Sequence, residues 1–218
     1  MESCTVSGYE VIVCEPAAQS SRVGVLLNDG EIAEKLSSMC EDVWLFGVVP
    51  RDRLNDYTPW PAAAMRKGAP DFGGGCESYT GHLTEGVLPL LSEKYGIGKW
   101  IYGGHSLGGL AAVYSLYYTG AFQAVFSVCG SFWYPGFLDF LSETRPVNTG
   151  AQVYLLNGAA EGAKHDNRLA KAPLFAAGAH DRIASAFLHT QAGFDPYGHH
   201  EHVTERLLNA VNWCKSQI

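Results

Sequence analysis

The architecture of this chain can be worked out from one segment, Lys99-Trp-Ile-Tyr-Gly-Gly-His-Ser-Leu-Gly-Gly-Leu-Ala-Ala-Val-Tyr114. Its β-prone beginning predicts a strand, and the small residues near its end predict a helix that follows at once. Between them stands Gly104-His-Ser-Leu-Gly108, a G-x-S-x-G pattern in a strand–turn–helix setting. The glycines are needed because side chains there would hold strand and helix apart. The pattern predicts that Ser106 is a nucleophile in a strained turn, with the Leu107 N–H at the helix N-terminus facing a developing oxyanion. The alternative is a glycine-rich turn without chemistry.

The rest of the sequence alternates between predicted strands and predicted helices. Short runs rich in valine, isoleucine and leucine predict strands at residues 9–14, 22–27, 43–49, 122–128 and 151–156. Apolar residues at helical spacing predict helices at residues 31–40, 77–95 (kinked at Pro89), 107–118, 173–188 and from 203 onward. This alternation predicts a mostly parallel sheet with helices on both faces, within a single domain of residues 1–218.

Composition and charge restrict the class of protein. The 218 residues carry a formal net charge of −7 without clustered lysine and arginine, which argues against nucleic acid as a partner. The sequence holds no apolar run long enough to span a membrane, and its beginning does not resemble a secretory signal. The six cysteines are scattered without a C-x-x-C pair, so we expect free thiols and a cytoplasmic location.

A serine nucleophile needs a base, and the base needs a carboxylate that orients it. In sites of this strand–turn–helix type the acid and then the histidine follow the serine along the chain. The loop after the strand predicted at residues 151–156 carries Glu161 and Asp166, of which we favour Glu161 as the acid. The turn-rich loop before the last helix carries His199 and His200; we favour His199, which follows a glycine, with His200 as the substitute.

Aromatic side chains on loops predict the substrate pocket. Trp60, Phe132 and Trp133, with Tyr57 and Tyr134 beside them, lie on segments that this fold places at the carboxyl edge of the sheet. We expect them to line the pocket, and ordinary loop packing is the alternative.

Three segments together resemble the esterase family of the α/β-hydrolase superfamily, which includes esterase D and enterochelin-type esterases. They are Val25-Leu-Leu-Asn-Asp-Gly-Glu31, Arg51-Asp-Arg-Leu-Asn-Asp-Tyr-Thr-Pro-Trp60, and the G-x-S-x-G segment followed by Gly130-Ser-Phe-Trp133. The resemblance runs from about residue 20 to the C-terminus.

The resemblance implies an α/β-hydrolase fold with a minimal lid or none, and a site made of Ser106, Glu161 and His199. It also implies a second oxyanion N–H near Asp29, Gly30 or Glu31. The sequence departs from the family in two places. Ala159 stands where the acid loop of relatives carries an aspartate, and the strand before the histidine is expected to be short or irregular near residues 191–194.

We therefore predict a serine hydrolase that cleaves carboxylic esters through an acyl-enzyme and needs no cofactor or metal. A small-molecule ester with a small or aromatic acyl group is the expected partner. Three alternatives remain: an acyltransferase with the same three residues, a non-catalytic binding domain of the same fold, and a metal hydrolase. The metal site would use the cluster of His199, His200, Glu201 and His202.

Overall fold

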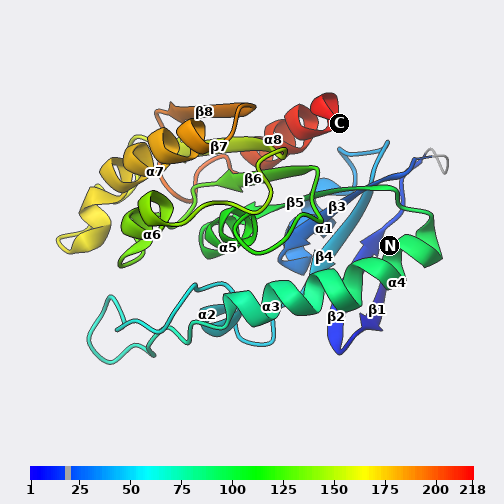
Figure 1. Cartoon of the computed structure of the whole chain (residues 1–218), viewed down its shortest axis with the longest axis horizontal. Helices are drawn as coiled ribbons and strands as arrows, with labels where there is room; N and C mark the ends of the chain where they lie inside the picture. Colours follow the sequence, from blue (N-terminus) through cyan, green and yellow to red (C-terminus); the bar gives the residue numbers. More distant parts are fainter. Residues whose placement is uncertain (18–20) are drawn as a thin grey trace.

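An eight-stranded sheet runs through the molecule in the order β1-β2-β4-β3-β5-β6-β7-β8 (Figure 1). The computed structural model describes residues 1–17 and 21–218. β1 and β2 pair antiparallel, β2 pairs antiparallel with β4, and all the remaining pairs are parallel. The strands are β1 (Glu2–Val6), β2 (Tyr9–Cys14), β3 (Val23–Asn28), β4 (Trp44–Val48), β5 (Lys99–His105), β6 (Ala124–Val128), β7 (Gln152–Gly158) and β8 (Thr190–Asp195).

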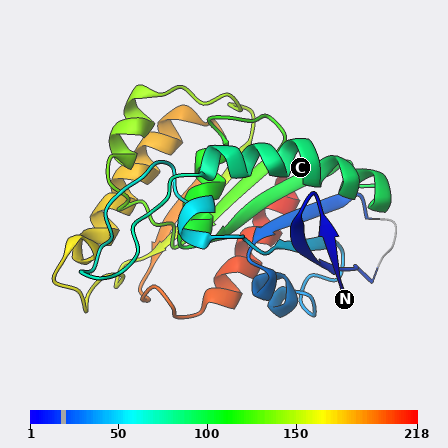
Figure 2. The same cartoon turned by 90° about the horizontal axis from the view of Figure 1, so that it is seen from below.

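Helices cover both faces of the sheet, as the sequence predicts. Apolar residues of α1 and α8 pack in one core, and those of α3, α4, α5, α6 and α7 pack in the other. Figure 2 shows the run of α3 and α4 lying across the strands. The helices are α1 (Gly30–Leu36), α2 (Arg53–Asp56), α3 (Cys76–His82), α4 (Leu88–Tyr95), α5 (Leu107–Ser115), α6 (Phe137–Glu143), α7 (Ala172–Ala186) and α8 (Val203–Gln217).

The two cores follow from the alternation of side chains along each central strand. On β3, Val25 and Leu27 point into the core under α1 and α8, while Leu26 points into the other core. All three are wholly buried. Each such side chain stabilises the fold by about 1.5–3 kcal/mol, so a strand buried on both faces reads as a continuous apolar run.

The register of the parallel strands brings their carboxyl ends to one edge. His105 at the end of β5 pairs with Val128 at the end of β6, and Gly158 at the end of β7 pairs with Asp195 at the end of β8. The loops that follow β5, β7 and β8 therefore meet at this edge, although they are far apart in the sequence.

Three features of the fold differ from the sequence-based expectation. β1 was not predicted. The helix predicted over residues 77–95 is interrupted by a π-helical segment, Leu83–Val87, and Pro89 lies in the first turn of α4. This irregularity contains Gly86, where a Cβ would stand 2.3 Å from Ser7 Oγ, so the hairpin of β1 and β2 approaches the helix closely. β8 is a continuous strand of six residues, because its pairing with β7 holds a sequence of weak β-propensity.

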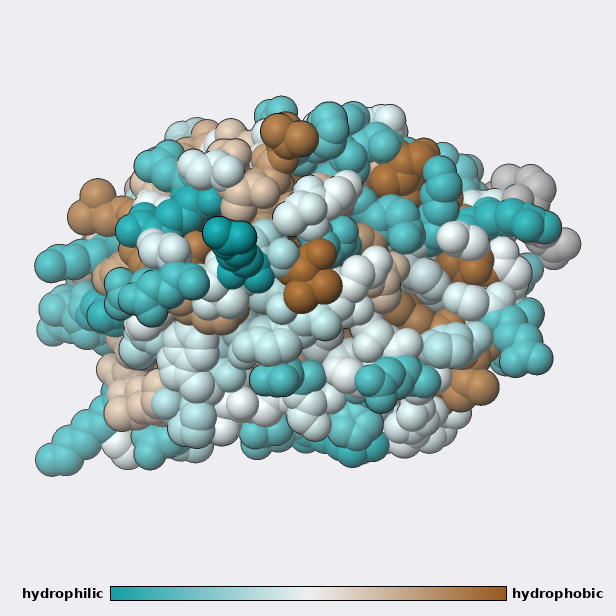
Figure 3. All heavy atoms as spheres, in the orientation of Figure 1, coloured by the Kyte–Doolittle hydropathy of each residue, from teal (hydrophilic) through white to brown (hydrophobic). Residues whose placement is uncertain are grey.

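The next features are the lack of a membrane-spanning helix in the described part of the chain, the hydropathy of the surface and the state of the cysteines. In the described part of the chain, no helix combines the length and apolar character needed to cross a bilayer. On the face seen in Figure 3, hydrophilic side chains predominate and hydrophobic ones lie apart from one another. All six cysteines, each among the described residues, are free thiols.

Candidate active site

The turn between β5 and α5 holds Ser106 in a strained conformation. Its φ of 61° and ψ of −123° lie where a non-glycine residue costs about 1–3 kcal/mol. The turn closes because two glycines allow close contact: a Cβ on Gly104 would stand 2.9 Å from the Gly108 carbonyl carbon, and one on Gly108 would stand 2.9 Å from Asn28 Cβ. The Ser106 N–H donates to the Val128 carbonyl at 3.0 Å, which ties the turn to β6. The strand–turn–helix geometry predicted from the G-x-S-x-G pattern is therefore present.

His199, in the loop after β8, brings its ring between Ser106 and Glu161. Its Nε2 lies 3.0 Å from Ser106 Oγ, and its Nδ1 lies 2.6 Å from Glu161 Oε2. A carboxylate only accepts hydrogen bonds, so Nδ1 carries the proton and Nε2 is free to accept the serine hydroxyl proton. This arrangement suits a general base.

Glu161 follows β7 and is 5% exposed. Its Oε1 accepts the Gly158 N–H at 2.7 Å and the Asn157 side-chain amide at 3.1 Å, while Oε2 faces His199. Burial by itself raises the pKa of Glu161, but the hydrogen bonds from His199, Gly158 and Asn157 outweigh it and hold the pKa below its usual value. The carboxylate is therefore ionised at neutral pH. Glu161, and not the exposed Asp166, occupies the position beside the histidine.

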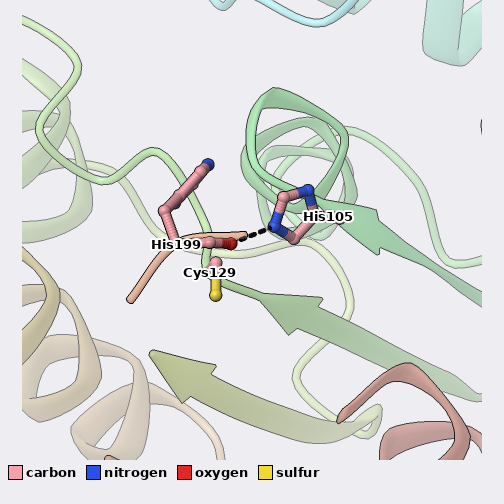
Figure 4. Close-up of side chains that lie close together, drawn as sticks. All are labelled: His105, Cys129 and His199. Atoms are coloured by element: carbon pink, nitrogen blue, oxygen red, sulfur yellow. Dashed lines mark hydrogen bonds between the residues drawn. The ribbon is translucent and has the colours of Figure 1, made fainter. Parts of the chain in front are cut away.

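The loop that carries His199 (residues 195–202, here the base loop) is held by its backbone carbonyls. His105 Nε2–H donates to the His199 carbonyl at 2.9 Å, as Figure 4 shows. Arg206, 3% exposed at the start of α8, donates to the Gly198 carbonyl at 2.9 Å and forms a two-pronged ion pair with Asp195. Burial, and next the nearby His199, lower the pKa of His105 to about 4, so its ring is neutral. Sequence reasoning missed the roles of His105 and Arg206 because the bonds by which they hold this loop include backbone carbonyls, which leave no pattern in the sequence.

The backbone N–H groups predicted to stabilise the oxyanion differ in whether they already have a hydrogen-bond partner. Leu107 is the first residue of α5, so its N–H has no partner within the helix and lies directly after the serine. Gly30 opens α1, in the loop that follows β3 beside the end of β5. The N–H of Glu31, by contrast, donates to the Asp29 side chain at 3.0 Å, so it caps α1 instead of facing the site. The Asp29 N–H donates to the Leu27 and Val48 carbonyls, which leaves Gly30 as the candidate for the second donor.

A cavity of about 250 Å³ opens onto the reacting groups. A larger groove of about 500 Å³ between β1 and α4 lies away from them and contains no paired nucleophile and base among its residues. The smaller cavity is lined by Ser106, Glu161 and His199, and around them by Arg66, Trp133, Gly162, His165, Leu169, Ala172 and His200.

Most of the aromatic residues predicted for the pocket lie in the core instead. Phe132 is wholly buried between Phe137 and His180 and does not reach the cavity. Trp60 packs partly buried against the core and does not line the cavity; its Nε1–H donates to the Pro135 carbonyl at 2.9 Å. Tyr57 and Tyr134 are buried as well, so Trp133 is the predicted aromatic that lines the cavity. The expectation was wrong for the others because these loops turn their large rings inward, where burial stabilises them most.

The side chains of the histidine cluster, residues 199–202, do not converge on one point as metal ligands would. Glu201 turns back to accept the Gly198 N–H, and the His202 ring packs on Tyr197. Among the described residues, the metal-ligating side chains that do come together are His105, Cys129 and His199. Figure 4 shows this group, in which His105 Nε2 is directed at the His199 carbonyl; the Cys129 sulfur in turn accepts a hydrogen bond from Arg206.

Comparison with known proteins identifies the family and the fold of this chain. The model of the family described as "Putative esterase" matches residues 27–202. The uncharacterized protein YbbA of Bacillus subtilis is 32% identical over 123 residues, which span 54% of this chain and only 49% of YbbA. The IroE-like serine hydrolase of Shewanella oneidensis superposes with a TM-score of 0.83 at 18% identity, over 100% of this chain and 81% of that one. The enterobactin esterase FES of Shigella flexneri superposes with a TM-score of 0.72 at 14% identity, over 96% of this chain and 55% of that one.

The structural matches establish the α/β-hydrolase fold. Because the family model matches most of the length of this chain, the chain belongs to this family of ester hydrolases.

Proposed function

We propose that this protein is a serine esterase that cleaves carboxylic esters through an acyl-enzyme on Ser106. The observation that carries the proposal is the position of the His199 ring, with Nε2 3.0 Å from Ser106 Oγ and Nδ1 2.6 Å from a buried carboxylate. A structural glycine-rich turn has no need of such a pair.

The residues can perform each step in turn. His199 Nε2 takes the Ser106 proton as Oγ attacks the ester carbonyl carbon, and Glu161 stabilises the imidazolium that forms. The N–H of Leu107, with that of Gly30 as the second donor, stabilises the negative charge on the carbonyl oxygen. The tetrahedral intermediate collapses, the C–O bond to the alcohol breaks, and the alcohol leaves with the proton from His199. Water then repeats the sequence on the acyl-enzyme, which releases the acid and restores Ser106.

The cavity supports small or aromatic acyl groups. Its volume of about 250 Å³ is below the range of about 300–1,000 Å³ usual for ligand sites, and Trp133 offers a flat apolar wall. Hydrolysis is proposed over transfer to another alcohol or thiol because the His199 side chain is 25% exposed, so water reaches the base. The net charge of −7 supports a small-molecule partner over nucleic acid, and the free thiols support a cytoplasmic setting.

The decisive test combines turnover with covalent labelling. Ser106→Ala is expected to lower hydrolysis of p-nitrophenyl acetate by at least about 10³-fold and to abolish labelling by a fluorophosphonate. The labelled peptide of the unaltered protein should contain Ser106. Ser185→Ala, at an exposed position on α7, is the matched control and should leave both readouts unchanged. Ser106→Ala protein that keeps more than a tenth of the activity would refute the proposed nucleophile.

A further inference from the structure

A buried histidine lies directly behind the acid. His180 on α7 is 5% exposed, and its Nε2 lies 3.1 Å from Oδ1 of Asn157. Asn157 is 2% exposed, and its Nδ2 lies 3.1 Å from Glu161 Oε1. A continuous hydrogen-bonded chain therefore runs from Ser106 through His199, Glu161 and Asn157 to His180. The reaction steps described above use only its first three members.

The orientation of each group in this chain is determined by its neighbours. Asn157 Nδ2 faces two acceptors, the Glu161 carboxylate and the Gly130 carbonyl at 3.3 Å, so it must be the amide nitrogen and not the oxygen. Its oxygen then faces His180, and an oxygen can only accept. His180 must therefore carry its proton on Nε2.

Glu161 needs this support because the terminal torsion of a glutamate is broad and poorly defined by itself. The Gly158 N–H and the Asn157 amide together hold Oε1, which leaves Oε2 aimed at His199. Without the bond from His180, the Asn157 oxygen becomes a buried acceptor with no donor facing it. The amide is then held at its nitrogen alone, and its hold on the Glu161 carboxylate weakens.

We propose that His180 is a positioning residue, which orients Glu161 through Asn157 and so keeps the His199 ring in line with Ser106. The proposal rests on the proposed esterase function. The surroundings favour a neutral ring: Phe132 and Phe194 pack against it, at centroid distances of 6.1 and 5.0 Å. Burial lowers the pKa of His180 to about 4, and the nearby Asp181 and Glu161 only partly oppose that effect. The ring is thus held as a neutral donor at neutral pH.

The kinetic test compares two substitutions at one position. His180→Phe keeps a planar ring for Phe132 and Phe194 but removes the donor, and His180→Gln keeps a donor amide. We expect His180→Phe to lower kcat for p-nitrophenyl acetate about 10-fold, the factor that the loss of one ordinary hydrogen bond produces, with KM within about 2-fold of the original. His180→Gln should restore at least half of the lost kcat. His189→Phe, at an exposed histidine after α7, is the matched control and should change neither constant.

Folding is checked by near-UV circular dichroism and melting temperature. A folded His180→Phe variant with unchanged kcat would overturn the proposal, and so would equal losses in the phenylalanine and glutamine variants. If His180→Phe does not fold, nitrogen-15 NMR of the unaltered protein still gives an answer. The His180 ring should be neutral and protonated on Nε2 at pH 7, and a proton on Nδ1 or a charged ring would contradict the proposal. Absence of Ser106-dependent turnover in the unaltered protein would instead refute the esterase function itself, so the two failures are distinguishable.

Discussion

The serine and the histidine of the site come from two regions that are held in different ways. The elbow, residues 104–109, is shaped by backbone geometry within a few residues, through close glycine contacts and the start of α5. The base loop, residues 195–202, is held instead by partners far along the chain, among them His105 and Glu161. The elbow is therefore set by local sterics, whereas the base loop depends on the whole fold. Substitutions in the two regions should therefore differ in how much they reduce stability and activity, and in the physical reason for the loss.

The largest effect is expected from a bulky residue in the elbow. A Cβ at Gly108 would stand 2.9 Å from Asn28 Cβ, and the branched side chain of Gly108→Val has no room between strand and helix. We expect the free energy of unfolding to fall by more than about 3 kcal/mol and esterase activity to disappear. Urea denaturation provides the measurement. Gly120→Val is the matched control, because a Cβ there meets nothing within 4 Å. A stable, active Gly108→Val protein would show that the elbow is not sterically closed.

A smaller loss is expected when the base loop loses its arginine. Arg206→Met removes the donor to the Gly198 carbonyl and leaves Asp195 without its cation. Because Asp195 stays partly exposed, losing the charged hydrogen bonds of Arg206 should lower the free energy of unfolding by about 1–3 kcal/mol. We also expect kcat to fall, because the loop that carries His199 is held less firmly. The control, Lys215→Met, breaks the more exposed ion pair with Asp42 and should cost less than about 1 kcal/mol. Equal losses in the two variants would mean that Arg206 has no special part in holding the loop.

The dependence of stability on pH tests the burial of two histidines near the site, His105 and His180. Burial lowers the pKa values of His105 and His180 from 6.5 to about 4. Between pH 6.5 and pH 4 these histidines bind more protons in the unfolded chain than in the folded protein. The free energy of unfolding is therefore highest above pH 6.5 and falls as the pH decreases toward 4. The loss amounts to at most about 3 kcal/mol for each histidine.

Urea denaturation from pH 7 to 4.5 measures this loss directly. His105→Gln should show a shallower fall with pH than the unaltered protein, whatever its stability at pH 7. A profile that is flat over this range in the unaltered protein would contradict the burial of these rings.

The smallest effect is expected from a hydroxyl beside the nucleophile. Ser131 Oγ lies 3.3 Å from Ser106 Oγ, and Ser131 is almost fully buried. Because a neutral hydrogen bond between hydroxyls contributes about 0.5–1.5 kcal/mol, Ser131→Ala should lower kcat by roughly 2- to 10-fold. Steady-state kinetics with p-nitrophenyl acetate test this. A loss comparable to that of Ser106→Ala would assign Ser131 a direct part in the chemistry.

The same division explains which expectations from the sequence hold. The parallel sheet, the strand–turn–helix around Ser106 and the helices on both faces were predictable, because periodicity and glycine positions report local geometry. The pocket aromatics were not, since a loop residue such as Phe132 carries no local signal for facing inward or outward. Arg66 and His165 were not predicted to line the cavity for a similar reason: only the path of two distant loops brings them there.

Residue order alone thus established the elbow, the alternation of strands and helices, and a short list of carboxylates and histidines. The choice among them depended on the folded chain. His199 rather than His200 stands beside Ser106, and Glu161 rather than Asp166 stands beside His199. The reason is that the register of β5, β6, β7 and β8 brings three loop ends to one edge of the sheet. Arg206, His105 and His180 then hold those ends through hydrogen bonds that span up to 94 residues of sequence. Local sterics act between neighbours in the chain and can be predicted from it, whereas hydrogen bonds between distant segments exist only after the sheet has formed.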